Sequence, residues 1–287
     1  MKNLKRYSIA LVALLFVTSS ALAFDFKVGG IYFNIISKVD KTVSITFKST
    51  NPFDCDGVYV GSVVIPERVV HKGVSYKVTE IGEYAFQSRT ELKGVTIPGT
   101  VTKIGSGAFS GCENLANVSI PNSVTYIGAN AFNNTTFMND ERQGIIYVGN
   151  CCVGFCGTYE SMKGEIAINS GTRLIANSAF SGCRYSTSVS IPEGVEYIGE
   201  YAFVRSGIET VTLPESIKSI GDHAFESCSD LRRVVLKSPK PPVLGADAFK
   251  WPVCDKITLV VPNFALRTYK TTLPWKNLSN IIGENFK

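Results

Sequence analysis

The residues with the widest chemical range in this sequence are its eight cysteines and two histidines. Cys112, Cys183 and Cys228 share one position of a sequence repeat, three residues after a phenylalanine. Equivalent positions two repeats apart would be separated by about 10 Å, because neighbouring parallel strands lie about 4.8 Å apart. A disulfide needs Cα atoms within about 7 Å. We therefore expect three buried thiols that act as small apolar side chains and form no disulfide.

A second cysteine group, Cys151, Cys152 and Cys156, lies in a stretch that predicts a β-hairpin with strands over 145–148 and 152–155. Cys152 is the candidate partner of Cys156 in a local disulfide, with Cys151 as the alternative. The hairpin itself has two interpretations. It is either a decayed repeat or insertion, or a protrusion that carries a function.

The remaining groups give little support for catalysis or metal binding. His71 and His223 are the only imidazole ligands, and the chain has no second cysteine cluster, so we predict no metal site and no cofactor. Neither histidine lies near a recognisable Ser or Cys nucleophile motif. His223 occupies a variable, outward position of the repeat, which predicts a solvated side chain. Cys55 and Cys254 fall at opposite ends of the fold and are not expected to meet. The sequence therefore predicts a protein that is not an enzyme.

A repeat of about 23 residues must position any site in this chain. Its block reads Ile-Gly-Glu-Tyr-Ala-Phe at 81–86. The later copies are Ile104–Phe109, Ile127–Phe132, Ile175–Phe180, Ile198–Phe203, Ile220–Phe225 and, more weakly, Leu244–Phe249. The step of 48 residues from Ile127 to Ile175 equals two periods, so one degenerate unit lies between these copies.

Short segments that alternate apolar and polar residues precede the blocks in a fixed phase, as at 95–97 and 189–191. Each reads as a short strand with two inward side chains and one outward. Proline commonly ends the strand because it has no backbone donor. We expect the glycine of the block to permit a turn, and its Ala and Phe to point into the coil. Stacked units then pair their strands into a parallel sheet.

The chain divides into four predicted parts. Residues 1–23 show the order of a secretory signal, with a basic start, an apolar core too short to span a bilayer and a small-x-small cleavage site. The rest comprises a β-rich N-terminal cap at 24–78, a solenoid of about seven to eight units at 79–262 with a degenerate unit at 137–165, and a cap with a short helix at 263–287.

Charge and hydropathy restrict the partners. The chain carries 29 basic and 24 acidic residues, and without the three basic residues of the signal the balance is 26 against 24. Nucleic-acid binding needs a concentrated basic face, so we predict no nucleic-acid partner. After signal cleavage no stretch is apolar enough to span a membrane. We expect an exported protein, secreted or at the cell surface, with the periplasm as a further location.

The Ile-Gly-x-x-Ala-Phe blocks and Val-x-Ile-Pro strands resemble the BspA-type leucine-rich repeats, which are common in secreted and surface proteins of Bacteroidetes and of some parasitic protists. The resemblance covers nearly all of residues 24–287. It implies a leucine-rich-repeat solenoid with a parallel β-sheet of short strands. It also implies interaction at the cell surface, such as adhesion to host matrix proteins, to other bacteria or to host receptors.

The outward strand positions predict a flat strip of small, mostly hydroxyl-bearing side chains. Thr96, Ser119, Ser190 and Thr212 are the candidate binding residues, although strand propensity alone also favours threonine there. We predict a monomeric binding protein whose partner is an extracellular protein, such as a host matrix or surface protein. The alternative is a glycan-binding protein or periplasmic scaffold, and exposed tyrosines aligned along one face would favour a glycan.

Replacement of Phe180 by Ala tests the inward placement of the block phenylalanines. We expect the free energy of unfolding to fall by about 3–5 kcal/mol, because truncation of a core aromatic leaves a cavity. Denaturation of the variant beside the parent protein measures the change. An unchanged melting temperature would refute the inward placement.

Overall fold

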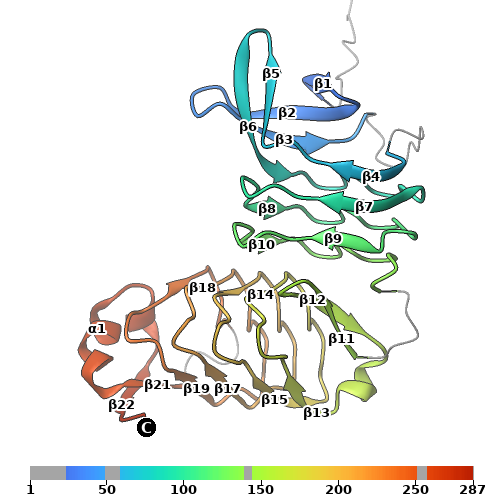
Figure 1. The fold of residues 1–287 in the computed structure, drawn as a ribbon. Helices are drawn as coiled ribbons and strands as arrows, with labels where there is room; N and C mark the ends of the chain where they lie inside the picture. The colour runs from blue at the N-terminus through green and yellow to red at the C-terminus, as the bar shows by residue number, and fades with distance from the viewer. Residues whose placement is uncertain (1–23, 49–58, 139–143, 251–256, 287) are drawn as a thin grey trace, which may run out of the picture.

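The computed structural model describes residues 24–48, 59–138, 144–250 and 257–286. Within them, successive coils build two stacks that meet at a bend near the middle of the chain (Figure 1). Each stack carries one sheet on each of two sides. The predicted signal at 1–23, Cys55 and Cys254 lie outside the described residues, and the division into four parts stays a prediction. Among the described residues, no helix is long and apolar enough to cross a membrane.

The first stack has an N-terminal sheet in the order β1-β2-β3-β6-β8-β10, with β5 paired to β6. Its strands are β1 (Phe26–Val28), β2 (Ile31–Ser37), β3 (Thr42–Thr46), β5 (Arg68–His71), β6 (Val74–Ile81), β8 (Lys103–Ile104) and β10 (Tyr126–Ile127). Strands β1 to β3 are antiparallel, and β3, β6, β8 and β10 are parallel. The second sheet of this stack is parallel, with β4 (Gly61–Val64), β7 (Leu92–Thr96) and β9 (Asn117–Ser119).

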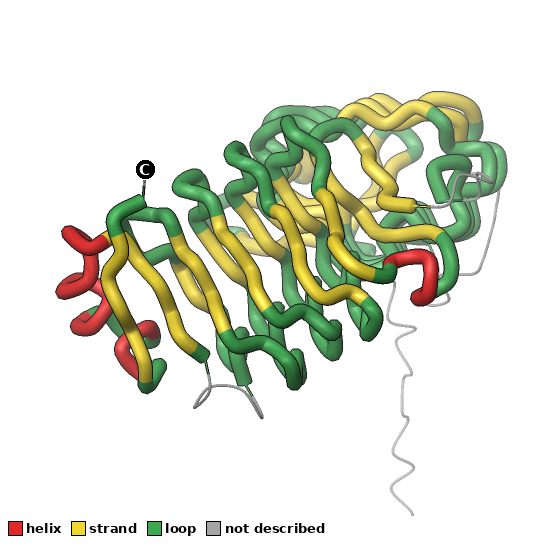
Figure 2. The backbone as a smooth tube through the Cα atoms, turned by 90° about the horizontal axis from the view of Figure 1, so that it is seen from below, coloured by secondary structure: helices red, strands yellow, loops and turns green. Residues whose placement is uncertain are grey.

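The second stack has two six-stranded sheets. One contains β11 (Gly144–Val148), β12 (Cys151–Cys156), β14 (Leu174–Ile175), β16 (Tyr197–Ile198), β18 (Ser219–Ile220) and β20 (Val243–Leu244). The other contains β13 (Gly164–Ala167), β15 (Ser186–Ser190), β17 (Thr210–Leu213), β19 (Arg233–Leu236), β21 (Thr258–Pro262) and β22 (Asn280–Glu284). Every pairing here is parallel except that of β11 with β12. Figure 2 shows the short strands joined by loops, with helix confined to a few turns.

The block phenylalanines fill the centre of each stack, as the sequence predicts. They are buried and stack on one another from coil to coil, with ring centroids 5.2 Å apart for Phe86 and Phe109 and 5.1 Å apart for Phe203 and Phe225. Such stacked aromatic pairs add to the free energy gained by burial. The predicted leucine-rich-repeat solenoid with parallel sheets of short strands is therefore confirmed.

The block glycine is required by contact between coils. A Cβ atom built on Gly105 would lie 2.5 Å from the backbone nitrogen of Glu83, and one on Gly221 would lie 2.6 Å from that of Glu200. The N–H of each of these glycines also donates to a carbonyl of the preceding coil, that of Gly105 to Ile81 at 2.8 Å. Only a residue without a side chain allows the two backbones to approach this closely.

The turn of each block does not lie at this glycine, where we expected it, but two residues later. There the backbone is left-handed at Tyr84, Gly107, Asn130, Ser178, Tyr201, His223 and Asp247. A second left-handed position follows two residues after the phenylalanine, at Ser88, Gly111, Asn134, Gly182, Arg205 and Ser227. Non-glycine residues adopt this conformation at a cost, so both turns are imposed by the stacking of the coils.

The stacking is interrupted where the hairpin of the degenerate unit enters. Strand β11 pairs with β12 on the edge that would otherwise meet β10, so the two sheets do not join. In the next unit Ala176 stands at the position of the block glycine. Its side chain fits because β12 stays extended through Cys156, where a regular coil would turn. Figure 1 shows the second stack turned relative to the first at this point.

The last coil is closed by helical turns, η2 (Asn263–Ala265), α1 (Leu266–Thr271) and η3 (Trp275–Asn277). Tyr269 and Trp275 are fully buried against each other, and Trp275 also contacts the ring of Phe249. The Tyr269 hydroxyl donates to the carbonyl of Ser238 at 2.9 Å, and Trp275 Nε1 donates to that of Pro242 at 2.8 Å. These bonds satisfy the polar atoms of two aromatic side chains that would otherwise be costly to bury.

Replacement of Gly221 by Ala tests the contact between coils. We expect the free energy of unfolding to fall by about 3 kcal/mol, because the added methyl group meets fixed backbone atoms. Gly99 is the matched control, since a Cβ there would meet no atom within 4 Å. Gly99→Ala should change stability by less than about 0.5 kcal/mol. Equal effects of the two substitutions in chemical denaturation would disprove the contact.

Candidate binding surface

The outward face of the β4-β7-β9 sheet carries a row of small side chains. Thr96 of β7 and Ser119 of β9 are register partners, both exposed, and Val64 of β4 continues their row. Val95, the neighbour of Thr96, is buried in the core. This alternation follows from the two-residue period of a strand, so Thr96 and Ser119 face outward as predicted.

The β13-β15-β17-β19 sheet carries the equivalent row in the second stack. Ser190 of β15 and Thr212 of β17 are register partners and both are exposed. Ala167 of β13 lies before them in the row, and the half-buried Val235 of β19 follows them. The row therefore changes from hydroxyl-bearing to apolar toward the C-terminal end.

The four candidate residues do not form one strip. Thr96 and Ser119 belong to one sheet and Ser190 and Thr212 to another, and β9 and β13 do not pair with each other. The cause is β11, which breaks the stack between the two sheets. The structure thus brings the candidates together as two separate pairs, and their role in binding stays a prediction.

A cleft lies at the bend, next to the first of these pairs. Its volume is about 390 Å³, and Thr96, Asn117, Ser119, Phe137 and Tyr147 are among the residues that line it. The sheet supplies the floor and the β11–β12 hairpin supplies a wall. The hairpin forms as predicted, but its position beside Thr96 and Ser119 was not foreseen.

Tyr147 is held firmly in the wall of this cleft. Its hydroxyl accepts the backbone N–H of Asn169 at 2.9 Å, and burial raises its pKa above the usual value for tyrosine. Tyr147 and Phe137 make this wall aromatic, whereas Thr96, Asn117 and Ser119 make the floor polar. Such a combination of apolar contact with a few oriented polar groups is common in binding sites.

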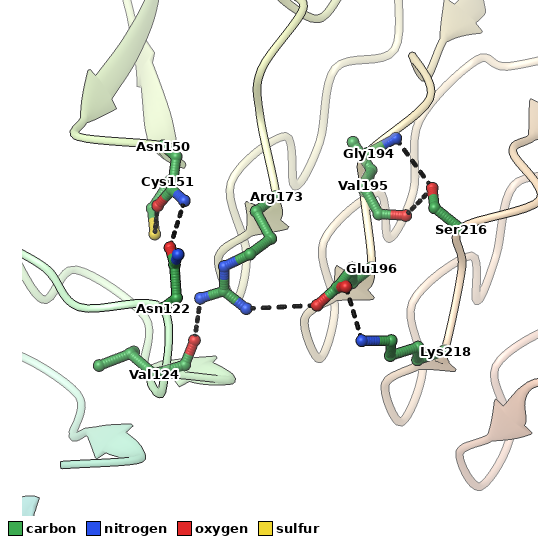
Figure 3. Close-up of polar contacts among 10 residues, drawn as sticks. All are labelled: Asn122, Val124, Asn150, Cys151, Arg173, Gly194, Val195, Glu196, Ser216 and Lys218. Atoms are coloured by element: carbon green, nitrogen blue, oxygen red, sulfur yellow. Dashed lines mark hydrogen bonds and ion pairs between the residues drawn. The ribbon is translucent and has the colours of Figure 1, made fainter. Parts of the chain in front are cut away.

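Arg173 connects the two stacks across the bend (Figure 3). Its guanidinium donates to the carbonyl of Val124 in the first stack and forms an ion pair with Glu196 in the second, at 3.6 Å. It also lies over the ring of Tyr197, 5.4 Å from the centroid. The side chain is only 11% exposed, and these contacts offset part of the cost of burying its charge, because Nε is buried without a hydrogen-bond partner.

Three further contacts lie at or beside the bend. Asn150, in the turn between β11 and β12, donates through Nδ2 to Oδ1 of Asn122 at 3.0 Å, and Glu196 also binds Lys218 at 2.6 Å (Figure 3). The backbone N–H of Asn177 donates to the carbonyl of Ile127 at 2.9 Å. We call Arg173, Asn122, Asn150, Asn177 and Glu196 the bend contacts.

The expected disulfide between Cys152 and Cys156 is not formed. Both residues lie in one extended strand, four positions apart, which corresponds to roughly 13 Å and is far beyond the reach of a disulfide. Cys152 faces the core, whereas the Cys156 thiol contacts the carbonyl of Met138 at 3.4 Å. Both thiols are free, as is that of Cys151, whose pKa is raised by burial to about 11.

The cysteines of the repeat position are buried, as predicted. The thiol of Cys112 donates to the carbonyl of Phe86 at 2.9 Å, and that of Cys228 donates to Phe203 at 3.1 Å. In each case the acceptor is the block phenylalanine of the preceding coil. Burial raises the pKa of the Cys183 thiol to about 11. These thiols therefore serve packing and have low reactivity.

The histidines have structural contacts. His223 is half-buried, with its ring stacked on Tyr201 at 4.7 Å and Nδ1 2.8 Å from Glu226, so the prediction of a solvated side chain was wrong. His71 stacks on Phe26 at 4.2 Å. No group of three or more potential metal ligands occurs within the described residues.

The tyrosines do not align along one exposed face. Tyr84 and Tyr201 share a repeat position and are 40% and 39% exposed, but they belong to different stacks. Tyr126 and Tyr197 are half-buried, with Lys103 over the ring of Tyr126 and Arg173 over that of Tyr197. This arrangement gives less support to a sugar-stacking surface than to a polar sheet face.

Comparisons with known proteins agree with the repeat. Residues 73–165 and 154–265 match the model of the BspA type leucine rich repeat region, in six copies. A sequence comparison with curated proteins gives no match. Among solved structures, a leucine rich repeat protein of T. pallidum is 23% identical, with 77% of this chain and 85% of that chain covered and a TM-score of 0.36.

Two further solved structures are similar. A leucine-rich repeat protein from Bacteroides ovatus is 21% identical, with 91% of this chain and 77% of that chain covered and a TM-score of 0.34. A leucine rich cell surface protein from Faecalibacterium prausnitzii is 23% identical, with 84% and 71% covered and a TM-score of 0.37.

Replacement of Arg173 by Leu tests the bend contacts. We expect the free energy of unfolding to fall by about 1–3 kcal/mol, because the buried carbonyl of Val124 loses its donor. Lys218→Met is the control, since Lys218 is exposed and its loss leaves Arg173 and Glu196 paired. Urea denaturation measures both. A Lys218 variant as unstable as the Arg173 variant would contradict this role of Arg173.

Proposed function

Because the chain belongs to the BspA-type leucine-rich-repeat family, we propose that it is an exported, non-enzymatic protein that binds an extracellular protein. Proteins of this family are secreted or lie at the cell surface. A host matrix or surface protein is the partner class that we favour, and adhesion is the role. We further propose that the chain acts as a monomer.

The observation that carries this proposal is the cleft at the bend. It places the hydroxyls of Thr96 and Ser119 beneath the aromatic wall of Phe137 and Tyr147. Small side chains on the floor allow close approach of a partner, and each hydroxyl can donate and accept a hydrogen bond. An aromatic side chain beside such groups is typical of residues that dominate binding energy.

The cleft alone is smaller than a typical protein interface, which covers about 800 Å² on each partner. Additional area is available on the outward rows of the sheets. Ser190 and Thr212 provide a second flat, polar region in the other stack. We propose that the cleft anchors the partner and that the sheet faces extend the contact.

The thiols and histidines support a role without catalysis. Burial raises the pKa of Cys151 to about 11, which keeps its thiol protonated and weakly nucleophilic at neutral pH. His71 is stacked on Phe26 and His223 on Tyr201, so both rings have packing contacts.

A glycan is the alternative partner, and one observation favours it. Tyr201 is 39% exposed and stacked on His223, which forms a small aromatic platform beside the Glu226 carboxylate. Sugar rings commonly stack on such surfaces while acidic groups bind their hydroxyls. This platform lies in the second stack, away from the cleft.

The test is a binding screen of residues 24–287 against extracellular matrix proteins and a glycan array. For a matrix protein that binds saturably, we expect Thr96→Glu/Ser119→Glu to raise Kd by at least about tenfold, because two buried charges would face the partner. Ser190→Glu/Thr212→Glu is the matched double substitution in the other sheet, and it should have a smaller effect.

The outcomes separate the hypotheses. A larger loss from the Ser190/Thr212 pair would move the anchor to the second stack. Binding to glycans alone, lost in Tyr201→Ala, would replace the protein partner with a sugar. If neither double substitution changes binding to a matrix protein, the sheet faces are not the site. Melting temperatures of all variants show whether the fold is intact.

A further inference from the structure

Two hairpin turns at the N-terminal end carry exposed aliphatic side chains. The turn between β2 and β3 spans 38–41, and Val39 at its tip is 89% exposed. Turn positions favour Gly, Pro, Asn, Asp and Ser for conformational reasons. A valine fully surrounded by water at such a tip contributes nothing to the turn or to the core.

The turn between β5 and β6 has the same character. Val70 is 61% exposed, and Val74, which pairs with His71 across the turn, is 36% exposed. Ile36, at the end of β2, is a fourth exposed aliphatic residue of this group. The β5–β6 hairpin projects beyond the first coil at the N-terminal end of the stack (Figure 1).

The two turns lie side by side. Ile36 at the end of β2 and Lys38 of the first turn line one hollow together with His71 at the end of β5 and Lys72 of the second turn. We call Ile36, Val39, Val70 and Val74, with the lysines at 38, 41 and 72, the N-terminal tips. Single exposed hydrophobic residues are ordinary on protein surfaces, but here four of them project from adjacent turns.

Lysines surround these aliphatic side chains. Lys38, Lys41 and Lys72 are exposed and form no ion pair with any described residue. Two carboxylates lie beside them, Asp25, which accepts the N–H of Ile35 at 2.7 Å, and Asp40, which accepts the Ser37 hydroxyl at 2.7 Å, so the three lysines outnumber the acidic groups. The tips therefore combine apolar side chains with positive charge.

We propose that the N-terminal tips dock on the surface of an anionic lipid membrane. Val39, Val70 and Val74 would enter the headgroup layer, and the lysines would bind lipid phosphates. Peripheral membrane binding rests on this combination of buried apolar area and attraction to anionic lipid. Two convex tips offer a protein partner little flat area, whereas a bilayer can deform around them.

The first measurement is co-sedimentation of residues 24–287 with vesicles. We expect binding to vesicles of equal parts phosphatidylglycerol and phosphatidylcholine, and weak or no binding to phosphatidylcholine alone. Salt screens the attraction, so binding should weaken between low and high sodium chloride. No binding to the anionic vesicles at low salt would overturn the proposal.

Substitutions then distinguish insertion of the valines into the headgroup layer from attraction of the lysines to the lipid phosphates. Val39→Asp/Val70→Asp should weaken partitioning by at least about tenfold for each valine, because the lost burial of one valine corresponds to that factor. Replacement of Lys38, Lys41 and Lys72 by Ser should weaken it by roughly fivefold for each charge. Val243→Asp is the matched control, since Val243 is 71% exposed in β20 of the other stack.

The valine pair decides the outcome. If Val39→Asp/Val70→Asp binds as the parent does while the lysine variant fails, only general surface charge attracts the protein and insertion is disproved. An equal loss in Val243→Asp would also overturn the assignment to the tips. All substituted residues are exposed, so unchanged melting temperatures are expected and check the fold.

Discussion

The contact between successive backbones at the block glycine is the constraint on which the rest of the structure depends. With no side chain at Gly105 or Gly221, each coil lies directly on the one before it, and the glycine N–H reaches a carbonyl of that coil. The phenylalanine rings can then stack at about 5 Å, close to the strand spacing of a sheet. The same coil-to-coil spacing separates the outward residues of successive strands. The packing of the core therefore also sets the distance between neighbouring residues in each surface row.

The bend arises where the backbone contact at the block glycine is absent. Strand β11 occupies the edge of β12, and β12 stays extended where a regular coil would turn, so Ala176 is accommodated and the stack restarts in another direction. The cleft beside Thr96 and Ser119 exists because the two sheets do not join. A local departure from the repeat thus accounts for the cleft.

Much of the fold could be predicted because the 23-residue period repeats the same physical problem in every unit. The inward phenylalanines, the outward Thr96 and Ser190, and the hairpin all follow from alternation and spacing.

The separation of the four candidate binding residues into two sheets could not be predicted. The repeat period does not indicate that β11 pairs with the edge of β12 that would otherwise meet β10. One signal was available in Ala176, which replaces the glycine that coil contact requires. The predicted Cys152–Cys156 disulfide was wrong because the two residues lie four positions apart in one extended strand. The stacking of His223 on Tyr201 depends on neighbouring coils, which a single repeat position does not reveal.

The bend contacts have a mechanical consequence. Within each stack, neighbouring coils share paired strands and a continuous column of rings, so a force along the stack is distributed over many bonds. Among the described residues, the polar contacts across the bend include the Arg173 guanidinium, the Asn122–Asn150 pair, the Asn177 amide and the Cys156 thiol at Met138. The side chains of Val148, Cys151, Leu174 and Ala176 add apolar contacts to the core of the first stack. We expect the bend to be more compliant than either stack, because no β-sheet of the described residues continues across it. Tension between a site on one stack and a site on the other would extend the bend before it opened a coil, and elastic yielding there would protect the rest of the fold from rupture.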